Sequence, residues 1–161
     1  MPELRTVLGE AGFSDVRTYV QSGNVVLSSR AGPAKVGAKA EAAIAERFGF
    51  DVDVIVRTAD ELAEVVACNP LAEVAENPKR YQVSFLDGEP DPEVVERISG
   101  LSVDGERLVV IGREAYTWHP DGVARSKLAA KLASAGGLGV RATARNWTTV
   151  TTLLEMASGG E

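Results

Sequence analysis

The chain has 161 residues, of which 45% are hydrophobic and 25% are charged, and its net charge is −6. This balance is that of an ordinary globular protein and excludes a disordered chain. No apolar run reaches the ~18 residues of a membrane-spanning helix, and the first residues lack the pattern of a secretory signal. We therefore expect a cytoplasmic protein with no membrane partner.

The single cysteine and the charge distribution narrow the range of partners. Cys68 is alone, which excludes a disulfide framework and a cysteine-ligated metal site within the chain, and we expect neither a cofactor nor a metal. The overall acidity also argues against nucleic acid as a partner. Residues 41–106 are strongly acidic, whereas residues 123–147 carry five basic residues and no acid. The basic stretch indicates an anion nearby, and a solvated basic surface is the competing interpretation.

Residues 1–57 are predicted to form the series helix, strand, strand, helix, strand. Apolar residues recur at helical spacing in the two helices, and Gly49 ends the second of them. Gly23 lies in the turn between the first two strands, which indicates a hairpin. Valine alternates with polar residues in the last strand. These elements are expected at residues 4–11, 16–20, 25–28, 33–48 and 51–57.

Residues 58–80 are predicted to be a connecting helix and loop, because Thr58 and Glu61 have the spacing of a capping box and Asn69-Pro70 then breaks the helix. Residues 81–157 are predicted to form the series β-α-β-β-α-β, followed by a C-terminal helix that Asn146 caps. The strands are expected at 81–86, 107–111, 115–118 and 140–143, and the helices at 91–99, 126–134 and 146–157.

The β-α-β-β-α-β series is the split βαβ arrangement of ferredoxin-like folds. The first series has the same order without its first strand. The sequence therefore predicts an α+β protein made of two ferredoxin-like halves, residues 1–57 and 81–157. The duplication is inferred from element order, since no repeat is visible residue by residue.

Three stretches carry a resemblance that covers essentially the whole chain. They are Thr18-Tyr19-Val20-Gln21-Ser22-Gly23-Asn24-Val25-Val26, Arg125-Ser126-Lys127-Leu128 and Thr143-Ala144-Arg145-Asn146-Trp147-Thr148-Thr149-Val150. With these, the sequence resembles the bacterial domain-of-unknown-function family 1697. Asn69-Pro70-Leu71 is similar to that family's Asn-Pro-aromatic stretch, with Leu71 in place of the aromatic residue. The resemblance implies a duplicated ferredoxin-like architecture and no particular activity.

Members of that family usually begin with a further strand and a Leu-Arg-Gly-Ile-Asn-type stretch, upstream of the position of Met1. This is the strand that the element order lacks. Without it, the strands near 25–28 and 52–57 would pair directly or leave open edges. We therefore expect a chain that is shortened relative to its functional form, or one that borrows a strand from a partner.

Nucleophilic and metal chemistry find little support in the sequence. His119 is the only histidine and precedes a Pro-Asp-Gly turn, so we interpret it as a polar residue on the turn side. Cys68 lies within a helical pattern and is expected to be an inert buried thiol. Four aromatic residues pair on strand faces, as in ferredoxin-like RNA binders, but the acidic chain favours core packing for them. They are Tyr81, Phe85, Tyr116 and Trp118.

The remaining candidate is an anion site at the starts of two predicted helices. The free N–H groups there favour anions, whereas cationic side chains at that end are electrostatically unfavourable. We therefore expect a small anionic or phosphorylated ligand where the two helix starts converge, and simple capping by Ser126 and Asn146 is the alternative. The proposed ligand-binding residues are Arg125, Ser126, Lys127, Thr143, Arg145 and Asn146.

A second polar patch is predicted at the hairpin turn, at Tyr19, Gln21, Ser22 and Asn24. The alternative function is a protein-interaction module, including homo-oligomerisation, that pairs through an exposed sheet edge. Whether the protein is an enzyme stays open at this stage.

Overall fold

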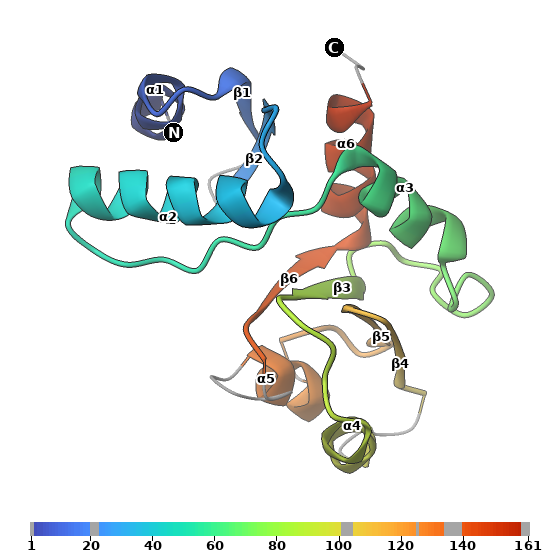
Figure 1. Ribbon diagram of the computed structural model, residues 1–161. Helices are drawn as coiled ribbons and strands as arrows, with labels where there is room; N and C mark the ends of the chain where they lie inside the picture. The colour runs from blue at the N-terminus through green and yellow to red at the C-terminus, as the bar shows by residue number, and fades with distance from the viewer. Residues whose placement is uncertain (1, 20–22, 101–104, 125, 134–139, 159–161) are drawn as a thin grey trace. The chain divides into compact units, whose positions relative to one another are not determined.

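The computed structural model of the chain describes residues 2–19, 23–100, 105–124, 126–133 and 140–158, and Figure 1 shows their helices and strands. The chain divides into two compact units. Unit 1 comprises Met1–Leu62 and Thr152–Glu161, and unit 2 comprises Ala63–Thr151. Each unit combines helices with an antiparallel sheet, so the predicted α+β class is confirmed.

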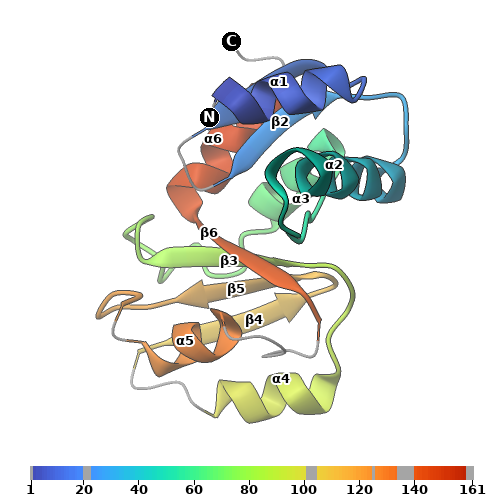
Figure 2. The same cartoon turned by 90° about the vertical axis from the view of Figure 1, so that its left-hand side faces the viewer.

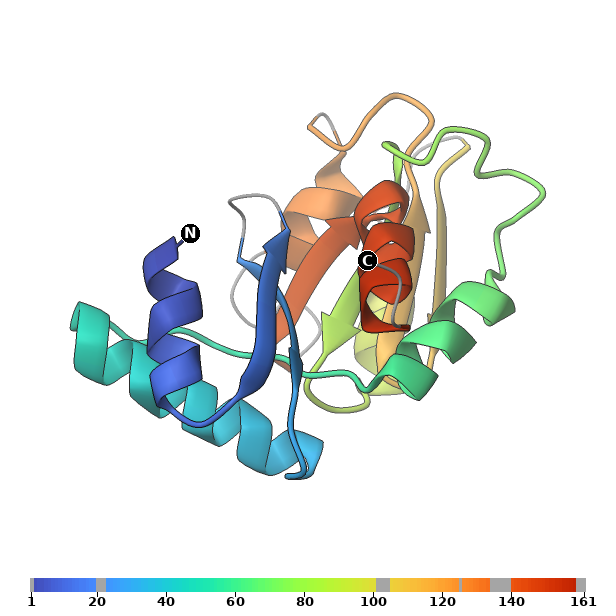
Figure 3. The same ribbon diagram turned by 90° about the horizontal axis from the view of Figure 1, so that it is seen from above.

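Unit 1 is a β-hairpin with two helices on one of its faces. Its elements are α1 (Pro2–Glu10), β1 (Ser14–Tyr19), β2 (Asn24–Ser28), α2 (Pro33–Phe48) and the last residues of α6 (Trp147–Ala157). The two strands lie side by side and antiparallel, with Arg17 opposite Val26, so the predicted hairpin is confirmed (Figure 3). Gly49, at φ 76°, closes α2 as expected of a glycine after a helix.

The core of unit 1 forms where apolar side chains of both helices meet one face of the hairpin. Its buried residues are Leu4, Leu8, Phe13, Val36 and Ala40. Val25 and Leu27 of β2 pack against this cluster, and so do Val54 and Val56, which follow α2. The alternating valines therefore face the core on one side of the segment after α2, as their alternation with polar residues predicted.

The strand predicted at residues 51–57 is wrong, because these residues belong to no helix or strand. The backbone N–H of Val54 donates to the Glu41 carboxylate at 2.8 Å. β1 and β2 form a two-stranded sheet, in which β2 has no second strand beside it among the described residues. Alternation predicts which side chains are buried, but a strand also needs a neighbour for its backbone hydrogen bonds.

Unit 2 contains a four-stranded antiparallel sheet in the order β4-β5-β3-β6. Its elements are β3 (Tyr81–Leu86), α4 (Pro92–Ser99), β4 (Arg107–Ile111), β5 (Glu114–Trp118), α5 (Lys127–Ala133) and β6 (Ala142–Asn146). The first strand of the series lies between the third and the fourth, as in a ferredoxin-like fold. The predicted architecture of this half is therefore confirmed.

Helices α4 and α5 cover one face of this sheet (Figure 2). Leu86 of β3, Ile98 of α4 and Leu128 of α5 share a buried cluster on that face. The Asp91 carboxylate caps α4 by accepting the Glu93 N–H at 2.9 Å. The two helices and the sheet therefore form one continuous core.

Aromatic side chains fill the other face of the sheet. The Tyr81 ring stacks on Trp147 with centroids 4.8 Å apart, and the Tyr81 hydroxyl donates to Asn69 Oδ1 at 2.7 Å. The Tyr116 hydroxyl donates to the carbonyl of Val65 in α3 (Ala59–Cys68) at 2.9 Å. Tyr81, Phe85, Tyr116 and Trp118 are all buried, which confirms core packing for them. These four rings are covered and cannot stack on bases of an RNA.

Candidate functional site

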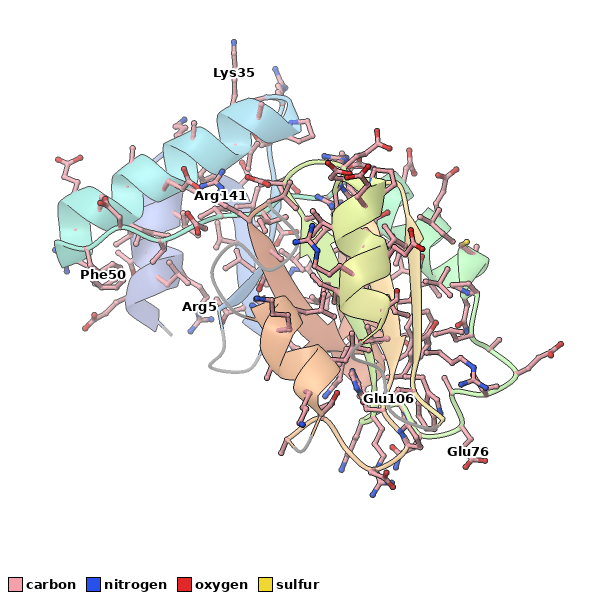
Figure 4. All side chains as sticks on the ribbon, turned by 90° about the horizontal axis from the view of Figure 1, so that it is seen from below. Arg5, Lys35, Phe50, Glu76, Glu106 and Arg141 are labelled. Atoms are coloured by element: carbon pink, nitrogen blue, oxygen red, sulfur yellow. The ribbon has the colours of Figure 1, made fainter. Side chains whose placement is uncertain are left out.

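A buried polar network joins the end of β5 to the start of α5 in unit 2. His119 is 0% exposed, and its Nδ1 lies 2.9 Å from Glu106 Oε2 and 3.0 Å from Ser126 Oγ. His119 Nε2 lies 2.9 Å from Thr117 Oγ1. Ser126 Oγ donates to Glu106 Oε2 and accepts the N–H of Ala129. Figure 4 labels Glu106 among the side chains of this unit.

One pattern of protons satisfies every group of this network. Nδ1–H of a neutral His119 donates to the Glu106 carboxylate, and the Thr117 hydroxyl donates to Nε2. Hydroxyl, imidazole and carboxylate then follow one another as in a catalytic triad. However, the Thr117 hydroxyl cannot reach a substrate, because this residue is 1% exposed. The network is therefore suited to holding the segment before α5 against the sheet.

The turn-side role expected for His119 is wrong, because the ring is completely buried. The sequence carried no signal for the network, since Glu106 precedes His119 by thirteen positions and stands just before β4. A second correction concerns Cys68, which is exposed rather than buried. It is the last residue of α3, where the helical pattern ends.

The structure does not bring the six predicted anion-site residues together. Ser126 belongs to the buried network, and Lys127 is exposed at the start of α5, on the sheet face that carries Leu86. In β6, Arg145 lies opposite Val83 and Thr143 opposite Phe85. Because side chains alternate along β3, Val83 and Phe85 point to the face opposite Leu86. Arg125 lies outside the described residues.

Thr143 and Arg145 are strand residues and not, as predicted, part of a helix start, because β6 ends at Asn146 and α6 begins at Trp147. The capping role of Asn146 is nevertheless present, since its Oδ1 accepts the N–H of Thr149 at 2.9 Å. The Arg145 guanidinium donates to Thr143 Oγ1 and to the Ala144 carbonyl, both at 2.8 Å. Removal from water lowers the pKa of Arg145.

The second predicted patch is part of the hairpin of unit 1. The Asn24 amide is buried and donates to the Tyr19 carbonyl at 3.2 Å, which closes the turn from inside. Tyr19 is half-buried at the end of β1. Gln21 and Ser22 lie outside the described residues. The two described members of this patch therefore have a structural role in the turn.

The edge strands of the two sheets differ in whether they carry charged residues. In unit 2, Arg107 opens β4, and Arg145 lies in β6. In unit 1, Asp15 and Arg17 lie in β1, whereas β2 has the sequence Asn-Val-Val-Leu-Ser and no charge. Charged residues on end strands discourage pairing with other chains. β2 is therefore an edge strand without a charged residue to discourage such pairing.

An exposed aromatic side chain lies in the same unit. Phe50 (Figure 4) follows Gly49, the residue that closes α2, and is 55% exposed. Its ring centroid lies 6.0 Å from that of Phe48. It immediately precedes residues 51–57, which belong to no helix or strand. Unit 1 therefore combines an uncharged strand with an exposed ring.

Among the described residues, no three histidine, cysteine, aspartate or glutamate side chains are grouped so that they could hold a metal ion. None of the described helices has the length and apolar character that crossing a membrane requires.

Comparison with known proteins places the chain in a family. No curated protein matches the sequence. The solved structure of a conserved bacterial protein from Streptococcus pneumoniae matches with a TM-score of 0.71 and 20% identity, over 98% of this chain and 88% of the other. This likeness shows a shared fold. The family described as proteins of unknown function, DUF1697, matches residues 1–116, and the chain therefore belongs to this family.

Proposed function

We propose that this chain is a binding module that takes up an extended peptide segment along the outer edge of β2. The observation that carries the proposal is the two-stranded sheet of unit 1, in which β2 lies at an end and has no charged residue. An extended peptide can add to such an edge through backbone hydrogen bonds, while alternate side chains determine specificity. The exposed ring of Phe50 supplies further apolar surface in the same unit.

A peptide with the sequence of β3, flanked by lysines for solubility, is a suitable probe. β3 is one of the two central strands of the unit 2 sheet, where it pairs antiparallel with β5 and β6. In excess, the peptide is expected to slow amide hydrogen exchange in residues 24–28, because new hydrogen bonds protect these amides. Residues 107–111 of β4, the charged end strand of unit 2, serve as the internal control.

Matched variants test which edge is used. Val26→Lys places a charge in β2 and is expected to weaken peptide binding by about tenfold or more, as lysine does on natural end strands. Val109→Lys, its counterpart in β4, is expected to leave the affinity unchanged. Equal loss in both variants, or no protection of residues 24–28, would contradict strand addition at β2.

A second candidate function is the binding of a small anion beside Thr143 and Arg145, which take the same face of the sheet. It is supported by the half-buried position of Arg145, since a guanidinium removed from water gains more from a nearby anion than one in bulk solvent. This narrower site omits Ser126, whose hydroxyl is engaged with Glu106. It also omits Lys127, which lies on the other face of the sheet, and Asn146, whose Oδ1 caps α6.

Titration with inorganic phosphate, followed by thermal unfolding, tests the anion site. At a phosphate concentration ~100 times the dissociation constant, the fold is expected to gain about 2.7 kcal/mol. Arg145→Gln is expected to abolish this gain, whereas Lys127→Gln is expected to retain it. Equal gains in both variants would show that phosphate binds elsewhere, and the absence of any gain in the unmodified protein would rule out this candidate.

A further inference from the structure

Three chain segments meet at the buried network around His119, and each carries an exposed base. One base directly follows Glu106, whose Oε2 lies 2.9 Å from His119 Nδ1. Another directly follows Ser126, whose Oγ lies 3.0 Å from the same nitrogen. The carbonyl oxygen of the third accepts the backbone N–H of His119 at 3.0 Å. In this order, the three bases are Arg107, Lys127 and Arg80.

These bases lie at one end of the four-stranded sheet, where β3 and β4 begin and β5 ends. Arg107 opens β4 opposite Trp118, and Trp118 lies opposite Tyr81, the first residue of β3. Figure 4 shows Glu106 at this end of the sheet and Arg141 at the other. With a fourth exposed base next to one of them in sequence, they form what we call the basic end of the sheet, which consists of Lys79, Arg80, Arg107 and Lys127.

The charges of the basic end are not balanced by ion pairs. The Arg80 guanidinium donates to the carbonyl of Pro120. The Arg107 guanidinium donates to the carbonyl of Glu106 at 3.0 Å. Both cations are thus held in place by neutral backbone groups. Among the described residues, no carboxylate lies within ion-pair distance of any of the four bases.

Acidic residues are scarce around the basic end. Within two positions of its members and of His119 along the described chain, the acids are Glu106, which is buried in the network, and Asp121, which is exposed. At the opposite end of the sheet, by contrast, Arg141 Nε lies 2.7 Å from Asp87 Oδ2. The basic end therefore combines four exposed cations with one exposed acid, in a chain whose net charge is −6.

We propose that the basic end of unit 2 binds an extended acidic segment of a partner protein. Neighbouring strands lie ~4.8 Å apart, so the backbones at Arg80 and Arg107, which β5 separates, lie about 10 Å apart. Acidic residues three positions apart on an extended chain have about the same spacing of ~10 Å. One acidic segment can therefore contact several of these bases at the same time, whereas a single carboxylate contacts one.

A protein segment fits this surface better than a nucleic acid does. Binding of single strands relies on exposed aromatic rings on which the bases stack. Tyr81 and Trp118, which lie at this end of β3 and β5, are only 1% and 6% exposed. The acidic remainder of the chain would also repel a long polyanion, whereas a short acidic segment ends where the bases end. The surface is independent of β2, because all four bases belong to unit 2.

Binding of a fluorescent octaglutamate peptide to the full chain tests this surface. The peptide is expected to bind at low salt although the net charge of the protein is −6. Raising sodium chloride from about 20 mM to about 200 mM is expected to weaken the complex, because salt screens exposed charges. In NMR spectra, the backbone amides of residues 79–80, 106–107 and 126–127 are expected to shift. Free glutamate at the same carboxylate concentration is expected to leave the peptide bound.

Matched double variants separate the basic end from the other bases of the chain. Arg80→Gln/Arg107→Gln is expected to weaken octaglutamate binding by about fivefold or more. Arg5→Gln/Lys35→Gln removes two exposed bases of unit 1 and is expected to leave the affinity unchanged (Figure 4). Lys127→Gln, on a different element, is expected to weaken binding by about twofold. Thermal unfolding checks that each variant is folded.

Three results would overturn the proposal. The first is the absence of octaglutamate binding at low salt, or amide shifts confined to other residues. The second is equal weakening by the two double variants, which would show attraction to positive charge in general. The third is an oligothymidylate of the same charge that binds at residues 79–80 and 106–107 as tightly as octaglutamate, which would assign this end of the sheet to nucleic acid.

Discussion

Replacing Glu106 by alanine is expected to lower the free energy of unfolding by about 3–5 kcal/mol, the usual cost of removing one partner of a buried ion pair or hydrogen-bonded network. Glu106 Oε2 receives hydrogen bonds from Ser126 and, in the proton pattern described above, from His119. Its side chain is 3% exposed, so water cannot replace the lost acceptor. Urea unfolding of the variant and the unmodified protein measures the difference.

Two further variants serve as controls for the Glu106→Ala prediction. Glu76→Ala removes an exposed glutamate from a loop and is expected to change stability by less than ~0.5 kcal/mol. Glu106→Gln retains one acceptor oxygen and is expected to cost less than Glu106→Ala, because part of the network stays satisfied. A loss below ~1 kcal/mol for Glu106→Ala would show that the network does not hold the segment before α5 in place.

The fold is expected to lose stability in alkaline solution because of its buried tyrosines. Burial raises the pKa of Tyr81 from 10.0 to about 12, and burial also raises the pKa of Tyr116. In the unfolded chain a tyrosine ionises near pH 10, whereas the folded protein keeps Tyr81 protonated up to about pH 12. This difference stabilises the fold, and the stabilisation is fully present below pH 10. That stabilisation is lost as the pH rises from about 10 to about 12, with about 2–3 kcal/mol expected from Tyr81 alone.

Urea unfolding at a series of pH values measures this loss, and tyrosinate absorbance follows the titration itself. Tyr81→Phe is expected to flatten the decline between pH 10 and 12, since phenylalanine keeps the ring but does not ionise. At neutral pH the same variant is expected to cost about 1 kcal/mol, because the Asn69 amide loses its hydrogen-bond partner. An unchanged alkaline decline in the double variant Tyr81→Phe/Tyr116→Phe would contradict this account.

The two predictions concern opposite faces of the sheet in unit 2. The Glu106 network lies on the face with α5, and the tyrosines lie on the other face beside α3 and Trp147. Both faces of the sheet are therefore largely covered by the unit's own helices. This leaves strand ends and edges, rather than the sheet surface, as the places where a partner can bind.

The sequence by itself determined the features that depend on neighbouring residues. Apolar spacing of 3.6 and 2 residues predicted the helices and the hairpin, because burial of one face imposes these periods. The capping box at Thr58 and Glu61 is present, with the two reciprocal bonds at 2.8 and 3.1 Å. Such contacts span three positions, so their partners are visible in a short window of sequence. The element order of residues 81–157 then restricted the topology to the one observed.

Only the tertiary structure decided the features that depend on distant partners. Whether residues 51–57 form a strand depends on a hydrogen-bonding neighbour, which their own alternation cannot reveal. Lys127 and Arg145 are separated because the Arg145 side chain takes the face of the sheet opposite to α5. Strand register determines which face a strand residue takes, and a shift of one residue reverses it. The burial of His119 depends on Glu106, which the fold brings within 2.9 Å. A side chain's role in such a site is set by its spatial neighbours, and the chain has to fold before those neighbours meet.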